Sequence, residues 1–148
     1  MPTHPPTATS TGIHCAATNL RMASRAAGRA YDRALAPLAL TTTQYAILAN
    51  IGRLETVATM DLAGILSLER TALYRALAVL ERRDLVAHVP GKGREQVLSL
   101  TEEGKRLRTE ARQLWQQVQD NFIAAFGADW QTFLTIADRA RRIAEEIA

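Results

Sequence analysis

Two arginines, a threonine and a tyrosine share one face of a helix predicted over residues 69–83. These four residues are Arg70, Thr71, Tyr74 and Arg75. Leucines at spacings of three and four form the opposite stripe of the same helix, which leaves the polar face free to meet a partner. Guanidinium groups can pair with the major-groove edge of guanine, and they also bind phosphate. The chemistry expected of this face is therefore hydrogen bonding and charge pairing with nucleic acid.

A second basic group lies in the loop between two short strands predicted at 85–89 and 97–100. This loop reads Pro-Gly-Lys-Gly-Arg and carries Lys92 and Arg94. The glycine on each side of Lys92 allows a tight and mobile tip. The hairpin therefore presents two cations at its exposed end.

A short helix and a turn precede the polar helix. The apolar spacing predicts a helix over 60–66, which Thr59 is expected to cap, and a turn at Ser67. Such turns often carry glycine where this chain has Ser67. Helix, turn, helix and hairpin follow one another in the order of a winged helix-turn-helix, which is a DNA-reading module.

Two further helices are predicted before this module. An alanine-rich helix over 13–35 ends at Pro37, because proline cannot continue a helix. The next helix opens with a capping box, in which a threonine hydroxyl from 41–43 accepts from an amide and Gln44 reaches back.

Two more helices are predicted after the hairpin. Thr101 is expected to cap the first, which ends at Gly127, and Asp129 is expected to cap the second. This pair holds both tryptophans and all three phenylalanines, so it needs a partner surface, and a second copy of the chain is the simplest partner. The predicted dimer interface consists of Ile13, Leu20, Trp130, Phe133, Leu134, Ile143 and Ile147.

The whole chain limits these interpretations. Its 148 residues suit one domain with its own core, preceded by a disordered arm at 1–12 that is rich in proline and threonine. The net charge of +3 is only mildly basic, so the position of the cations matters more than their number. No apolar run is long enough for a membrane helix, and the N-terminus does not read as a secretory signal. A single cysteine fits a cytoplasmic protein.

The succession of motifs resembles the MarR family, the multiple-antibiotic-resistance-type transcriptional regulators. The matching segments are LTTTQYAIL at 40–48, LAxxLxLxRTxLxRxLxxLERRxLV at 62–86 and LSLTEEG at 98–104. The resemblance covers roughly 13–148. It implies a mainly α fold with a small β-hairpin wing, in which 41–100 form the DNA-binding lobe and 13–38 and 101–148 form the dimerisation helices.

The resemblance also implies how the chain would meet DNA. In the family a homodimer reads a palindromic operator, with the second helix of each motif in the major groove and each wing tip in the minor groove. The DNA-binding residues carried over to this chain are Ser67, Arg70, Thr71, Tyr74, Arg75, Lys92 and Arg94. The family often has an aspartate where this chain has Lys92, so Arg94 lacks the group that would orient it and is expected to act mainly as an electrostatic contact.

Family members commonly bind small aromatic or phenolic acids between the dimer helices and the DNA-binding lobe. The candidate lining residues here are Arg21, Arg25, Tyr31 and Tyr45. Some relatives instead sense oxidants through a cysteine near the dimer interface, and Cys15 could do so, since a helix N-terminus favours a thiolate. A small buried apolar role for Cys15 remains the alternative. The three histidines show no ligand spacing, so no metal and no cofactor are expected.

The leading hypothesis is a sequence-specific DNA-binding regulator, a homodimeric repressor that a small ligand or oxidation of Cys15 releases. The sequence leaves open the effector, the operator and the sign of regulation. A winged-helix module that binds protein without reading DNA is the alternative of another class, but it would favour apolar residues in place of the exposed arginines. No catalytic constellation is present in the sequence, so an enzyme is not expected.

Overall fold

The computed structural model describes residues 15–148 as a set of helices with one small antiparallel sheet. The elements in chain order are α1 (Ala16–Leu35), η1 (Ala36–Leu38), α2 (Thr42–Leu54), β1 (Thr56–Val57), α3 (Thr59–Leu66), α4 (Arg70–Arg82), β2 (Val86–Pro90), β3 (Gln96–Leu100), α5 (Glu102–Phe126), η2 (Gly127–Asp129) and α6 (Trp130–Ile147). This order confirms the predicted mainly α, winged helix-turn-helix fold. The predicted arm at 1–12 and the interface residue Ile13 lie outside the described residues.

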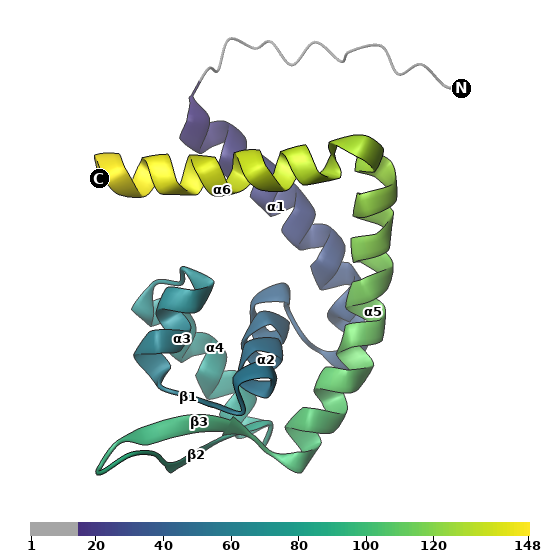
Figure 1. Cartoon of the computed structure of the whole chain (residues 1–148). Helices are drawn as coiled ribbons and strands as arrows, with labels where there is room; N and C mark the ends of the chain where they lie inside the picture. Colours follow the sequence, from purple (N-terminus) through teal and green to yellow (C-terminus); the bar gives the residue numbers. More distant parts are fainter. Residues whose placement is uncertain (1–14) are drawn as a thin grey trace.

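Helices α2, α3 and α4 and the sheet gather into one lobe, from which α5 runs away (Figure 1). At the far end of α5 the chain turns through η2, and α6 extends back across the top of the molecule. Helix α1 packs along α5, where the Tyr31 hydroxyl donates to Gln119 Oε1 at 2.7 Å. The long helices α1, α5 and α6 therefore form a frame to which the lobe is attached.

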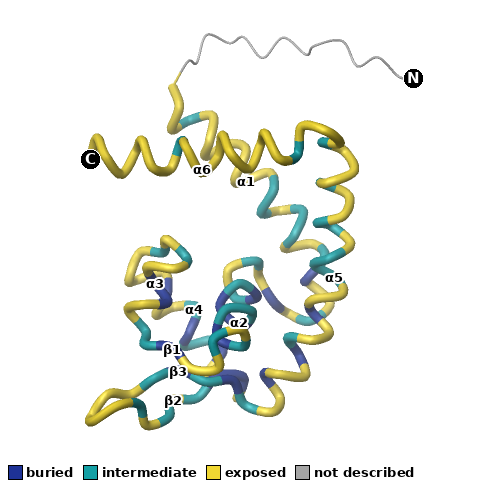
Figure 2. The backbone as a smooth tube through the Cα atoms, viewed as in Figure 1, coloured by how far each residue is buried: buried dark blue, intermediate teal, exposed yellow. Residues whose placement is uncertain are grey.

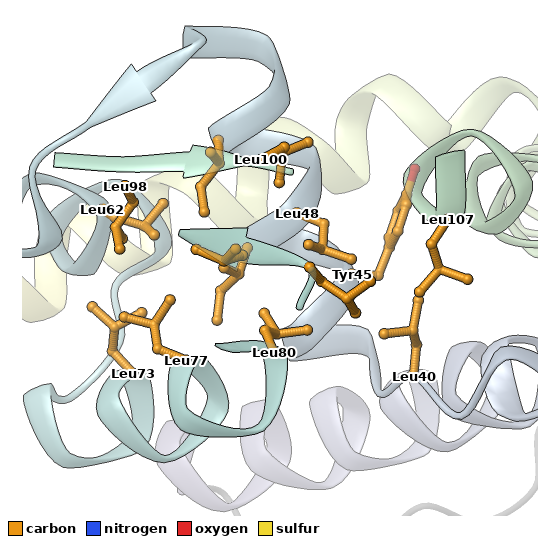
Figure 3. Close-up of a cluster of buried hydrophobic side chains, with 14 of the residues drawn as sticks. Leu40, Tyr45, Leu48, Leu62, Leu73, Leu77, Leu80, Leu98, Leu100 and Leu107 are labelled. Atoms are coloured by element: carbon orange, nitrogen blue, oxygen red, sulfur yellow. The ribbon is translucent and has the colours of Figure 1, made fainter. Parts of the chain in front are cut away.

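The hydrophobic core draws on each helix of the lobe and extends to Leu107 on α5 (Figure 3). Leu35 at the end of α1 and Ala111 on α5 also belong to it. Its fully buried larger side chains are Leu35, Ile47, Leu48, Ile51, Leu62, Leu73, Leu80, Leu85 and Leu98. Burial of one such side chain stabilises the fold by about 1.5–3 kcal/mol. The predicted leucine stripe of α4 is confirmed: Leu73, Leu77 and Leu80 are buried, and the polar residues of this helix therefore face outward.

The sheet has a strand that the sequence analysis did not predict. Its order is β1-β3-β2, with Val57 opposite Leu98 and Val86 opposite Leu100. Only two residues form β1, and a pair of residues carries no readable alternation. The predicted hairpin of β2 and β3 thus belongs to a three-stranded sheet in which β3 is central and β1 forms the other edge.

Four predicted caps can be compared with the structure, and the one at Thr101 is confirmed because its hydroxyl accepts from Gly104 N at 2.9 Å. The capping box at α2 is confirmed, since the Thr41 hydroxyl accepts from Gln44 N while Gln44 Oε1 accepts from Thr41 N. The predicted cap at Thr59 was wrong, because the helix begins one residue earlier than expected and Ala58 takes the cap position. Asp129 makes no side-chain cap, since the chain enters α6 directly from the helical turn η2.

Candidate nucleic-acid interface

Helix α4 presents an exposed polar face on the side of the lobe away from the core. Arg70, Thr71, Tyr74 and Arg75 are all exposed, and Tyr74 keeps 45% of its surface accessible. The Arg70 guanidinium lies over the Tyr74 ring, 5.5 Å from its centre, which is within the range of a cation–π contact. The tyrosine therefore restrains the direction in which Arg70 extends.

The turn before α4 brings this face into position. Ser67 ends α3 with a φ of 49°, a left-handed conformation, and its amide bonds to carbonyls of α3. Its side chain stays exposed beside the start of α4. Glu69 occupies the cap position of α4 without making a side-chain cap. The first amides of α4 therefore lack a capping side chain and suit an anion.

The wing carries its cations at the tip. Lys92 and Arg94 are exposed between β2 and β3, and Gly93 has a φ of 63°. The loop is closed by Gly91 N donating to Glu95 O at 2.9 Å and Glu95 N donating to Lys92 O at 3.2 Å. The tip of this hairpin extends away from the helices of the lobe (Figure 1).

A contact between side chains joins the wing to α4. His88 Nε2 on β2 lies 2.9 Å from Glu81 Oε1 on α4. Sequence analysis placed His88 in the wing but did not identify this partner. Both side chains are exposed, so this contact joins β2 to α4 at the surface of the lobe.

The cations of this surface have no acidic partners within residues 15–148. Neither Arg70 nor Arg75 forms an ion pair there, and neither Lys92 nor Arg94 does so. The ion pairs of the described chain gather instead on α5, on α6 and at His88. Unpaired, hydrated cations on one surface are the arrangement that binds a polyanion by releasing its counterions.

Cys15 lies at the N-terminal end of α1 and is exposed in the single chain, so its own chain does not give it the small buried role considered from the sequence. Its thiol pKa is lowered, chiefly because the amide and hydroxyl of Thr18 and the amide of Ala17 can donate to the thiolate. The nearby charge of Arg21 contributes in the same direction. This side chain therefore favours the reactive, ionised form.

The structure brings together only two of the four residues predicted to line a ligand site. Tyr31 and Tyr45 both pack against Trp115, with ring centres 6.2 and 5.9 Å away. Burial raises the pKa of both phenols. Arg21 and Arg25 lie earlier on α1, where both are exposed.

Three arginines that the sequence analysis did not single out surround Tyr45 instead. Arg53 of α2 and Arg108 and Arg112 of α5 line a hollow of about 330 Å³ together with Tyr45 and Asn50. Arg53 Nη2 donates to Asn50 Oδ1 at 3.2 Å, while Arg108 and Arg112 lower the pKa of Tyr45 against the effect of burial. We call this the arginine hollow. The i, i+4 spacing of Arg108 and Arg112 indicates that both lie on one face of a helix. Their proximity to Arg53 depends on how α2 packs on α5.

No ion pair neutralises these three arginines within the described part of the chain. A second hollow of about 540 Å³ continues on the other side of Arg108 and includes Lys105 and Thr109. The region between α2 and α5 therefore has a positive charge that could be offset by a bound anion.

Helix α6 has an apolar face that the described chain leaves largely uncovered beyond the contacts of Trp130 and Phe133 with Phe126. None of its residues is buried, and Figure 2 shows it as exposed along almost its whole length. Phe133, Leu134 and Ile143 each keep about 40–45% of their surface accessible, and Ile147 keeps 81%. Trp130 is half-buried against Phe126 and Phe133, while Leu20 on α1 is half exposed. The predicted interface residues within 15–148 are thus open to a partner.

Residues 15–148 contain no group of three or more histidine, cysteine, aspartate or glutamate side chains that could hold a metal ion. None of their helices is both long enough and apolar enough to span a bilayer.

Known proteins share both the lobe and the whole chain's architecture. A family model for a winged helix DNA-binding domain matches residues 40–104. The crystal structure of the transcriptional regulator MosR from M. tuberculosis is 35% identical, with 90% of this chain and 98% of MosR covered and a TM-score of 0.81. A structure of MosR in complex with DNA gives the same identity and coverage with a TM-score of 0.80.

A more distant similarity extends to a second regulator. A mutant MarR from E. coli, complexed with operator DNA, is 22% identical over 84% of this chain and 91% of its own, with a TM-score of 0.73. At that identity the likeness concerns the fold alone. No curated protein matches the sequence.

Proposed function

The chain belongs to the MarR family of transcriptional regulators, and we propose that it acts as a homodimeric repressor that binds a palindromic DNA operator. One observation carries the proposal. The exposed face of α4 holds unpaired Arg70 and Arg75 beside a wing whose tip carries unpaired Arg94. A winged-helix module that binds protein would instead expose apolar side chains on this face.

Helix α4 would read the major groove. Arg70 and Arg75 would bind guanine edges or phosphates, with Thr71 and Tyr74 between them and Ser67 at a phosphate near the helix start. Arg94 on the wing suits the negative potential of a narrow minor groove, and Lys92 would add a phosphate contact. The DNA complex known for MosR supports this assignment, because MosR shares the fold over 98% of its length.

The apolar face of α6 supports the homodimer. A helix of this length that buries no residue gains little stability from its own chain, so a second copy that covers Phe133, Leu134 and Ile147 would stabilise it. Two copies would also place two α4 helices on one duplex. Half-sites about one helical turn apart would then match the two-fold symmetry of the protein.

The arginine hollow supports release by a small aromatic or phenolic acid. A carboxylate would pair with Arg53, Arg108 or Arg112, and its ring would lie by Tyr45. The hollow lies between α2 of the lobe and α5 of the frame, so an occupant would change how the lobe is held. A coupling of about 1–3 kcal/mol is sufficient to release an operator, provided that the acid binds the DNA-free dimer more tightly.

Cys15 supports a second mode of release. It is exposed and its thiol pKa is lowered by donors from Ala17 and Thr18. Oxidation there would add a charged or bulky group at the start of α1, next to the predicted interface residue Leu20. This mode differs from the first in that reductant reverses it.

Titration of labelled duplexes tests the proposal. We expect the purified chain to bind its own upstream intergenic DNA at least about a hundredfold more tightly than a scrambled duplex at physiological salt. Arg70→Ala and Arg75→Ala should remove most of this preference, whereas Arg29→Ala, on the exposed face of α1, should not. Equal affinity for the two duplexes at every salt concentration would count against sequence-specific reading.

A further inference from the structure

Arg83 joins the end of α4 to the link between α1 and α2. Its Nη1 donates to Ala39 O at 2.7 Å and its Nη2 donates to Leu38 O at 2.9 Å. These residues are far apart in sequence, and the two carbonyls belong to the segment that connects the frame to the lobe. In the sequence Arg83 is only the last residue of the predicted helix 69–83, and nothing there indicates its carbonyl partners.

These two bonds act beside other contacts of the link, because Thr42 donates from its amide and its hydroxyl to Asp32 Oδ1 at 2.7 and 2.6 Å and Leu40 is buried. Ala39 has a φ of 51°, a left-handed conformation that costs energy for a residue with a Cβ. Within the described chain no other group donates to the Leu38 or Ala39 carbonyl. A planar guanidinium can satisfy both carbonyls at once, whereas an ammonium holds them less rigidly.

Residues 83–85, which directly follow α4, are also fixed to α5. Thr101 donates twice to this segment, from its hydroxyl to Asp84 O at 2.6 Å and from its amide to Leu85 O at 3.2 Å. Gly104 lies so close that a Cβ there would be 2.0 Å from Leu85 O. The segment 83–85 is therefore bonded both to the link that follows α1 and to the start of α5.

We propose that Arg83 is a positioning residue that fixes the angle between the DNA-reading lobe and the frame. This proposal rests on the proposed function, because the angle between lobe and frame affects DNA binding only if two lobes must meet half-sites at a fixed spacing. The lobe also packs on α5 through α2 and through the core residues Leu107 and Ala111. The Arg83 bonds add a separate connection, which ties the end of α4 to the link and so restrains the orientation of α4 relative to the frame.

The variants Arg83→Ala, Arg83→Lys and Arg82→Ala test the proposal in the full chain. Arg82 is exposed, carries the same charge and makes no hydrogen bond or ion pair in the described chain, so it is the matched control. Two properties are measured. The first is hydrogen exchange of the amides of Ala39 and Leu40, which bond to Ala36 O and Leu35 O. The second is the spacing ratio, which we define as the affinity for the operator divided by the affinity for the same operator with one base pair inserted between its half-sites.

We expect Arg83→Ala to raise exchange in the link about fivefold to tenfold and to lower the spacing ratio by about fivefold. Arg83→Lys should give intermediate values for both, and it carries the test if Arg83→Ala is too unstable to purify. Arg82→Ala should match the wild type in both measurements. Overall operator affinity should fall less than the spacing ratio, because Arg83 does not touch DNA.

Two results would overturn the proposal. Unchanged exchange in the link would mean that the two bonds do not hold it. Raised exchange with an unchanged spacing ratio would reduce Arg83 to a local structural role. If the wild-type chain itself did not distinguish the two operators, the proposed function would fail as well, and the wild-type data would identify that failure separately.

Discussion

Arg108 lies directly against the backbone of Gly52. A Cβ added at Gly52 would stand 2.7 Å from Arg108 Nε and 2.8 Å from its Cδ and Cζ. Glycine inside a helix lowers stability by about 1 kcal/mol relative to alanine, so Gly52 weakens α2. The same glycine lets Arg108 reach over α2 and close one side of the arginine hollow.

Gly52→Ala should therefore separate stability from ligand binding. The free energy of unfolding in urea should rise by up to about 1 kcal/mol, because the atoms displaced belong to a flexible side chain. The affinity for benzoate or 4-hydroxybenzoate, measured by calorimetry, should fall about tenfold because Arg108 leaves the hollow. Gly28→Ala is the control, since nothing lies within 4 Å of a Cβ there. Undiminished affinity in Gly52→Ala would exclude Arg108 from the binding site.

Gly104→Ala should have the opposite effect on stability. The atom that its Cβ would meet is a backbone carbonyl, Leu85 O, which cannot move without separating α5 from the end of α4. We expect a loss of about 2–4 kcal/mol in chemical unfolding. Gly64→Ala, in open space on α3, should cause no loss. Similar stabilities of the two variants would show that α5 does not pack as described.

Loss of Arg94 and loss of Arg70 should affect DNA binding in different ways. Arg94→Ala should weaken the operator and a scrambled duplex alike and reduce the slope of log affinity against log salt by about 1. Arg70→Ala should lower operator affinity about tenfold or more while changing the scrambled duplex little. Binding titrations over a salt series distinguish the two. An operator-selective loss in Arg94→Ala would instead make the wing a base reader.

Cys15 should react with iodoacetamide at a lower pH than a free cysteine does. The pKa of its thiol is lowered, so the thiolate fraction at any pH below that of a free thiol is larger, and the inflection of rate against pH moves down. Thr18→Val removes the hydroxyl donor and should move the inflection back up, while Cys15→Ser should abolish labelling. A profile like that of free cysteine would remove the main support for release by oxidation.

Leu134→Glu should convert the dimer into a monomer. The side chain is 40% exposed in the isolated chain, so the substitution leaves the lobe core intact. In a two-fold interface the same change buries two carboxylates, which should weaken association at least about tenfold. Sedimentation over a concentration series measures this, with the exposed Gln131→Glu as control. A dimer mass retained by Leu134→Glu over the same concentrations would place the interface elsewhere.

The sequence was sufficient where local chemistry decides the structure. The Thr41–Gln44 capping box and the leucine spacing of α4 each depend on residues a few positions apart, and both were predicted. The exposed face of α4 followed from the same spacing. These features gave the fold class and the nucleic-acid surface.

Features that depend on the packing of distant segments could not be predicted. Strand β1 exists because Thr56 and Val57 pair with β3, and the arginine hollow exists because α2 packs on α5. Arg83 looked like a charge at a helix end, since its carbonyl partners lie 44 and 45 residues away. A single sequence does not show which distant segments pack together.

The open face of α6 makes the lifetime of the protein depend on how much of it is present. A helix that buries no residue in its own chain frays easily, so proteases should trim the C-terminus of an unpaired copy first. Pairing protects this end, and the paired fraction rises with concentration. We therefore expect scarce copies to be removed faster than abundant ones, which would give the cell a threshold below which the regulator does not accumulate.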